Sequence, residues 1–111
     1  MISYITNNFG LREKDMQYMM QLFQSYPAVE KVILYGSRAR GDFRLGSDVD
    51  LALAGPTISS KDVMRIHSKL EEDSPIPLGF DVVHYDTIEN QILKKLIIEE
   101  GVFIYQKQEK I

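Results

Sequence analysis

Two aspartates separated by a single residue are the first feature of this sequence that could support chemistry. Asp48 and Asp50 alternate with the apolar residues Val49 and Leu51, in the period-two pattern of a β-strand. On a strand the two carboxylates leave the same face, with Cα atoms roughly 6.5 Å apart. Divalent cations between them would remove their mutual repulsion, and two Mg²⁺ ions are what a phosphoryl or nucleotidyl transfer site requires. An isolated pair more often marks a solvent-facing strand end, so the neighbouring sequence decides between these interpretations.

A possible phosphate-binding turn lies upstream of this pair. Gly36 and Ser37 follow the apolar run at residues 32–35, where a strand ends and a short helical turn can begin. Free backbone N–H groups and the Ser37 hydroxyl could hold a phosphate there, and Gly36 permits close approach of the backbone. Alone, the two residues would indicate only a turn. Residues 42–43 replace the Lys-Ser/Thr of a P-loop, and no G-x-G-x-x-G is present, so the familiar phosphate loops are excluded.

Asp81 adds a third carboxylate. It lies in the apolar segment 80–85, which predicts another strand, and a charge in such a setting needs a partner. A metal ion shared with the first two aspartates would provide one, and would leave Asp81 able to help deprotonate an incoming hydroxyl. The alternative is an edge-strand aspartate that faces water.

These features occur together in one known family. Residues 36–42, residues 46–51 and Asp81 closely resemble the nucleotidyltransferase superfamily related to DNA polymerase beta, and specifically its minimal nucleotidyltransferase (MNT) branch. The resemblance covers most of the chain in element order. It implies a polymerase-beta-like fold and transfer of a nucleoside monophosphate from a nucleoside triphosphate to an acceptor hydroxyl.

The resemblance also implies roles for individual residues. The triphosphate would be held by Gly36 and Ser37, and two Mg²⁺ ions by Asp48 and Asp50, with Asp81 completing one of the two metal sites. Arg38 and Arg40 would lie near the phosphates, where guanidinium groups can neutralise charge on the leaving pyrophosphate. The catalytic set is complete in this sequence.

The remaining pattern predicts the elements that must position these residues. We expect helices over 13–25, from Ser59 to about residue 70, and from a cap at Asp86 to Gly101, and strands over 32–35, 49–53, 80–85 and 102–105. Ser59 and Asp62 form a capping-box pattern, whereas residues 71–73 indicate a fraying, solvated helix end. The fold class is therefore α/β (α+β), a small mixed β-sheet flanked by helices.

Length and composition narrow the class of protein. The 111 residues suit a single nucleotidyltransferase domain over 1–111, without room for a separate substrate domain. There is no cysteine, no apolar run long enough to span a membrane and no signal-peptide pattern, so we expect a cytoplasmic protein. A net charge of −3 argues against direct nucleic-acid binding. The two histidines, His67 and His84, are interpreted as surface or packing residues.

The acceptor is the least determined part of the prediction. Minimal family members resembling this chain are typically paired with a small all-helical HEPN protein in toxin–antitoxin pairs. We therefore expect an antitoxin that transfers AMP from ATP to a hydroxyl of a HEPN toxin. The expected acceptor is a tyrosine. Two alternatives remain open: a nucleotide-binding module that masks its partner without catalysis, and a transferase acting on a small-molecule hydroxyl.

Overall fold

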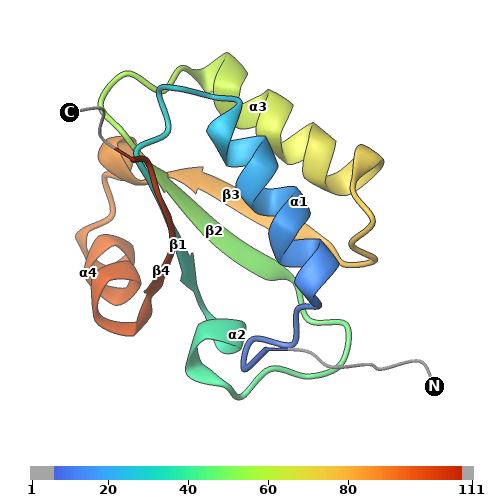
Figure 1. Ribbon diagram of the computed structural model, residues 1–111. Helices are drawn as coiled ribbons and strands as arrows, with labels where there is room; N and C mark the ends of the chain where they lie inside the picture. Colours follow the sequence, from blue (N-terminus) through green and yellow to red (C-terminus); the bar gives the residue numbers. More distant parts are fainter. Residues whose placement is uncertain (1–6, 109–111) are drawn as a thin grey trace.

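The computed structural model of the chain describes residues 7–108 (Figure 1). In chain order, the elements are α1 (Glu13–Gln24), β1 (Lys31–Tyr35), α2 (Ser37–Arg40), β2 (Val49–Ala54), α3 (Ser60–Ser68), the π-helical turn η1 (Lys69–Asp73), β3 (Phe80–His84), the 3₁₀ turn η2 (Tyr85–Thr87), α4 (Gln91–Glu100) and β4 (Val102–Gln106). The predicted order of helices and strands is confirmed. None of the helices in the described residues is long and apolar enough to cross a membrane.

The four strands form one mixed sheet in the spatial order β3-β2-β1-β4. β1 pairs antiparallel with both β2 and β4, whereas β2 and β3 run parallel. A parallel pair needs a long crossover connection, and α3 with η1 provides it. The predicted small mixed sheet flanked by helices is confirmed, and its outer strands are β3 and β4.

The larger core lies between one face of the sheet and helices α1 and α3, which lie side by side over that face (Figure 1). Alternate positions of the central strands point into it, including Leu34 of β1 and Leu51 of β2. Met19 and Phe23 of α1 and Ile66 of α3 are fully buried against them. Helix α1 therefore supplies Met19 and Phe23 to the main core.

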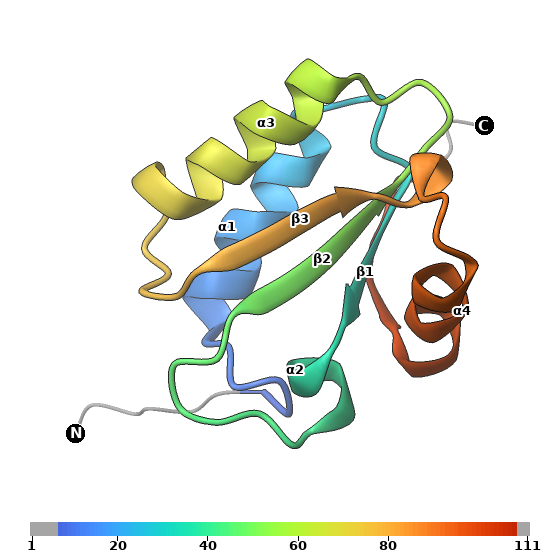
Figure 2. The same cartoon turned by 180° about the vertical axis from the view of Figure 1, so that it is seen from behind.

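The opposite face carries a smaller core under α4 (Figure 2). Ile33, Tyr35 and Ala52 on this face are buried together with Ile97 of α4. Strand alternation places Asp50 on the same face as Ala52. The small α4 cluster thus borders the carboxylates, which separates the chemistry from the main core on the other face.

The ends of two helices test the predicted caps. The Ser59 side chain accepts a hydrogen bond from the Asp62 N–H at 3.0 Å, and the Asp62 carboxylate accepts from the Ser59 N–H at 3.1 Å, which confirms the capping box. The predicted cap at Asp86 is wrong, because Asn90 caps α4 by accepting from two backbone N–H groups of its first turn. The η2 turn intervenes, and Asp86 accepts instead from the Gly55 N–H at 2.9 Å.

Residues 71–73 are exposed, as predicted, but they do not form a fraying helix end. The helix continues beyond α3 as the π-helical turn η1, which buries Leu70. Glu71 accepts a hydrogen bond from the Phe80 N–H at 2.8 Å, so this turn is tied to the beginning of β3. A sequence pattern cannot reveal such a contact, because it depends on where the crossover returns to the sheet.

Candidate active site

The three predicted aspartates come together where β1 ends and β2 and β3 begin. Asp50 of β2 lies directly opposite Asp81 in the parallel register of β2 and β3. Asp48 precedes β2 by one residue, two positions from Asp50. Since directly paired residues of neighbouring strands share a face, Asp50 and Asp81 leave the sheet on the same side.

The electrostatics of Asp50 reflect this crowding. Burial raises the pKa of Asp50, the charges on Asp81 and Asp48 raise it further, and the charge on Arg40 lowers it in part. A carboxylate in this position is costly to ionise without a cation nearby. The cost would be relieved by a bound divalent metal ion.

Two glycines make room for the carboxylates. Gly36 has a φ of +76°, and a Cβ at that position would overlap Asp50 Oδ2. A Cβ at Gly79 would lie 2.6 Å from Asp48 Oδ1. Gly36 is therefore required both for its left-handed backbone conformation and for the close approach of Asp50.

Gly36 is also the residue immediately before the short helix α2, at its N-cap. The first hydrogen bond of this helix runs from the Arg40 N–H to the Gly36 carbonyl at 3.1 Å. The N–H groups of Ser37 and the next two residues therefore have no acceptor within the helix. Because Tyr35 pairs with Asp50 across β1 and β2, this turn adjoins the aspartates. The predicted phosphate-binding turn thus lies beside the predicted metal ligand Asp50.

Arg38 is buried, which is unusual for a charged side chain. The residue is 3% exposed, and its guanidinium donates to the Ser47 carbonyl at 3.0 and 2.7 Å and to the Phe9 carbonyl at 2.9 Å. The guanidinium also lies 4.7 Å from the centre of the Phe43 ring. Burial lowers the pKa of Arg38, and the charge on Asp48 raises it. These contacts hold the segment that delivers Asp48 to the site.

Arg40 is more accessible. Its side chain is 40% exposed and pairs with the carboxylates of Asp42 at 3.2 Å and Glu100 at 2.9 Å. Glu100 ends α4, so this pair connects α2 to the helix on the same face of the sheet. The positive charge on Arg40 lowers the pKa of Asp50 in part.

Sequence reasoning missed Tyr35 as a part of this site. Tyr35 is 6% exposed, and its pKa is raised to about 12 by burial and by the charges on Asp81 and Asp50. The phenol is therefore neutral at any physiological pH. The only sequence signal was its place as the last residue of the strand before Gly36.

Carboxylate oxygens are the ligands that Mg²⁺ prefers, so the donor set fits this metal. The two glycines leave space beside Asp50 and Asp48, and burial together with the charges on Asp81 and Asp48 raises the pKa of Asp50. Within residues 7–108 no three acidic or histidine side chains are already closed around one point as a metal site. Asp48, Asp50 and Asp81 would be the groups to hold the ion.

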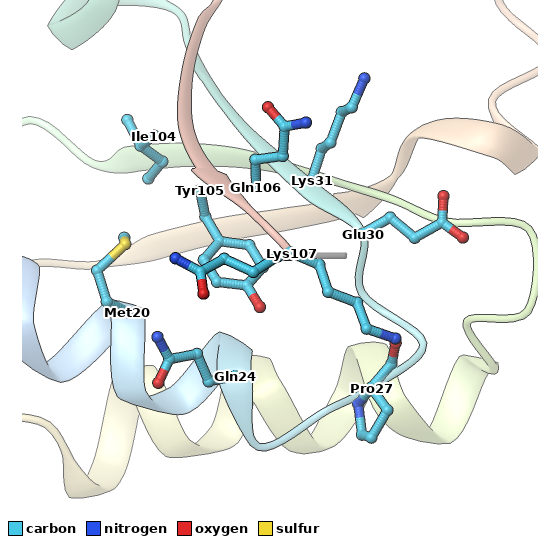
Figure 3. A pocket seen from close by; sticks show the side chains of 10 residues that line it. Met20, Gln24, Pro27, Glu30, Lys31, Ile104, Tyr105, Gln106 and Lys107 are labelled. Atoms are coloured by element: carbon cyan, nitrogen blue, oxygen red, sulfur yellow. The ribbon is translucent and has the colours of Figure 1, made fainter. Parts of the chain in front are cut away.

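A groove on the surface lies elsewhere (Figure 3). It runs between the end of α1 and strand β4, and its lining includes Met20, Gln24, Tyr105 and Lys107. Among its lining residues within 7–108, Glu30 is the only acidic one, and a single carboxylate does not provide the several that a Mg²⁺ pair requires. The chemistry of the chain is therefore expected at the aspartates.

Comparisons with known proteins agree with this fold. Residues 17–110 match the family described as "Polymerase beta, Nucleotidyltransferase". No curated protein matches the sequence.

Solved structures share the fold at low sequence identity. A crystal structure of a toxin–antitoxin with AMP-PNP is 19% identical, with a TM-score of 0.70 over 85% of this chain and 75% of the other. The toxin–antitoxin MntA-HepT is 15% identical, with a TM-score of 0.65 over 86% and 74%. A structure from Shewanella oneidensis is 12% identical, with a TM-score of 0.62 over 86% and 74%.

The family match spans β1 with its Gly36–Ser37 turn, β2 with Asp48 and Asp50, and β3 with Asp81. The match and the mixed sheet lead to the same assignment, and the chain belongs to the polymerase beta nucleotidyltransferase family.

Proposed function

We propose that this chain is a Mg²⁺-dependent nucleotidyltransferase that transfers AMP from ATP to a hydroxyl of a partner protein. The observation that carries the proposal is the register of Asp50 with Asp81 across β2 and β3, with Asp48 two residues away and the Gly36–Ser37 turn adjacent. Bound Mg²⁺ would supply charge neutralisation on the phosphates and on the attacking oxygen.

The proposed reaction takes place between ATP and the acceptor hydroxyl, and side chains of this protein assist it. The acceptor oxygen forms a bond to the α-phosphorus of ATP, the bond from that phosphorus to the bridging oxygen breaks, and pyrophosphate leaves. Asp81 takes the proton of the acceptor hydroxyl. The Ser37 hydroxyl and the N–H groups that begin α2 donate to the phosphates, and the exposed Arg40 neutralises charge on the departing pyrophosphate.

Arg38 has a different part in this proposal. Its donors engage the carbonyls of Ser47 and Phe9, so it acts by holding the segment before Asp48. Its proximity to the phosphates, which the family resemblance implies, is then secondary to this positioning role.

We further propose that the acceptor is a tyrosine hydroxyl of a small all-helical HEPN toxin, which makes the chain an antitoxin of the MNT branch. Support comes from the motifs at residues 36–42 and 46–51, and from the similarity of the fold to proteins crystallised as toxin–antitoxin complexes, one of them with AMP-PNP. The nucleotide analogue in that relative favours ATP as the donor.

The test is a labelling experiment. The native chain is incubated with Mg²⁺ and a host lysate, once with ATP labelled at the α-phosphate and once with ATP labelled at the γ-phosphate. The proposal predicts a protein band with the α label only, absent with Asp50→Asn or Asp81→Asn. Glu89→Gln, which removes an exposed carboxylate on the loop before α4, should label as the native chain does.

Each other outcome has a distinct meaning. A band with the γ label would indicate phosphoryl transfer. ATP binding without a labelled protein would favour the non-catalytic binding module, and label recovered in a small molecule would favour the small-molecule acceptor. Mass spectrometry of the labelled band identifies the modified residue, and a residue other than tyrosine would refute the acceptor proposal.

A further inference from the structure

In the sheet formed by residues 7–108, strand β3 lies at an edge, so its outward-facing backbone groups have no neighbouring strand there. The Val49 N–H of β2 donates to the Gly79 carbonyl at 2.9 Å, which shows that Gly79 faces β2. Since backbone groups alternate in direction along a strand, the N–H and C=O of Phe80 face outward. Phe80 is the residue immediately before Asp81.

Two side chains take the place of the missing strand at Phe80. The Phe80 N–H donates to Glu71 Oε1 at 2.8 Å, and His67 Nε2 lies 2.8 Å from the Phe80 carbonyl oxygen. Because that oxygen can only accept, Nε2 must carry the proton. His67 Nε2 also lies 3.3 Å from Glu71 Oε1, so the two side chains and the Phe80 backbone form one network.

Both side chains of this network come from the crossover between β2 and β3. His67 lies in the last turn of α3, and Glu71 follows four residues later in η1. A π-helical turn widens the helix by one residue and often occurs at functional sites. Ser74 Oγ donates to the Leu70 carbonyl at 2.6 Å, which satisfies a carbonyl at the end of this turn.

The network binds the backbone of Phe80, the residue before Asp81, which indicates a role in positioning the Asp81 carboxylate. Asp81 is paired with Asp50, and the two like charges push the beginning of β3 away from β2. The Phe80 side chain is 5% exposed in the main core, but its backbone at the sheet edge would otherwise be free to separate. Hydrogen bonds to both backbone groups of Phe80 oppose this separation.

We propose that Glu71 and His67 are positioning residues that hold Phe80 and thereby fix Asp81 opposite Asp50 for binding a divalent cation. The inference rests on the proposed function in that Asp81 completes a metal site. In this proposal Glu71 and His67 act through the backbone of Phe80, to which both are hydrogen-bonded, and not as ligands of the metal ion or the nucleotide.

The test measures Mg²⁺ binding by calorimetry in the presence of AMP-PNP, with no acceptor protein. We expect Glu71→Ala to weaken Mg²⁺ binding roughly tenfold, the lower end of the effect seen when a group that orients a metal ligand is removed. Glu71→Gln keeps a carbonyl oxygen that can accept from the Phe80 N–H, and should restore binding to within about threefold of the native chain. His67→Gln and His67→Ala form a second pair with the same expected contrast.

Glu72→Ala is the matched control, because Glu72 is the exposed neighbour of Glu71 in the same turn. It should bind Mg²⁺ as the native chain does. Amide hydrogen exchange at Phe80 should accelerate in Glu71→Ala and not in Glu72→Ala. Thermal unfolding of each variant shows that it is folded at the temperature of the binding measurement.

The outcomes separate this inference from the proposed function. If Mg²⁺ binding depends on Glu71, the positioning role is supported even when the native chain labels no protein. The absence of labelling would refute the proposed transfer reaction and would leave the positioning role in place. Unchanged Mg²⁺ affinity in Glu71→Ala, equal loss in Glu71→Gln, or no Mg²⁺ binding by the native chain would each overturn the positioning role.

Discussion

Replacing Asp50 with asparagine should make the metal-free protein more stable while abolishing its transfer activity. Asp50 lies directly opposite Asp81 and two residues from Asp48, and burial and both charges raise its pKa. A carboxyl whose pKa is raised on folding makes its full stabilising contribution below the pKa of the unfolded chain, and this contribution is lost as pH rises through the folded pKa. At neutral pH the native chain therefore carries a penalty that Asp50→Asn removes.

The geometry gives the size of this penalty. Neighbouring strands lie about 4.8 Å apart, and two unit charges at that separation interact by roughly 1 kcal/mol in water and about 3.5 kcal/mol at an effective dielectric constant of 20. Partial exposure of Asp50 and the opposing charge on Arg40 discount the larger value. We expect a gain of about 1–2 kcal/mol, which for a domain of this size raises Tm by at least about 4 °C.

The assay is thermal and urea unfolding in buffer with a chelator, at neutral pH and at a series of lower values. The difference between Asp50→Asn and the native chain should shrink as pH falls, because Asp50 becomes protonated in the native protein. Added Mg²⁺ should stabilise the native chain more than the variant. Glu89→Gln removes one exposed carboxylate and serves as the control for a change in net charge.

Two results would refute this reasoning. If Asp50→Asn were no more stable than the native chain without metal, the carboxylates would not repel one another as their register implies. If the gain were the same at every pH, its source would be something other than the ionisation of Asp50.

Three further predictions concern the surroundings of the aspartates. Gly36→Ala should reduce transfer far more than Gly41→Ala, because both positions have positive φ but only a Cβ at Gly36 would overlap Asp50; equal losses in a labelling assay would contradict this. Arg38→Met should destabilise the fold by about 2–4 kcal/mol in urea unfolding, since it leaves the Ser47 and Phe9 carbonyls without their donor, and a neutral effect would show that these contacts are dispensable. In an ultraviolet titration, one tyrosine should ionise at about 12, and this pKa should fall in Asp81→Asn; a titration without the high-pKa group would rule out the burial of the Tyr35 phenol.

Local patterns in the sequence were sufficient for much of the fold. The alternation around Asp48 and Asp50 predicted a strand, and β2 begins at Val49. The spacing of Ser59 and Asp62 predicted the helix start that the structure has. Such features depend on residues within one or two turns of one another, so periodicity and capping chemistry are enough to find them.

Other features depended on contacts between distant segments. The predicted cap at Asp86 failed because its carboxylate is used by Gly55, which is 31 positions away in sequence. Arg38, predicted near the phosphates, also donates to the carbonyls of Phe9 and Ser47, which lie on either side of it in sequence. The residue type alone could not reveal these contacts, because they depend on how distant loops fold against α2.

The sequence by itself determined which groups are available for chemistry: three carboxylates, a Gly-Ser turn and the strands that carry them. The tertiary structure decided how these groups meet, by pairing β2 in parallel with β3 so that Asp50 faces Asp81. It also decided that Glu71, predicted as part of a solvated helix end, binds the edge of β3. The physical reason is that strand register and edge contacts are set by the packing of the whole sheet and its crossover, which no local spacing records.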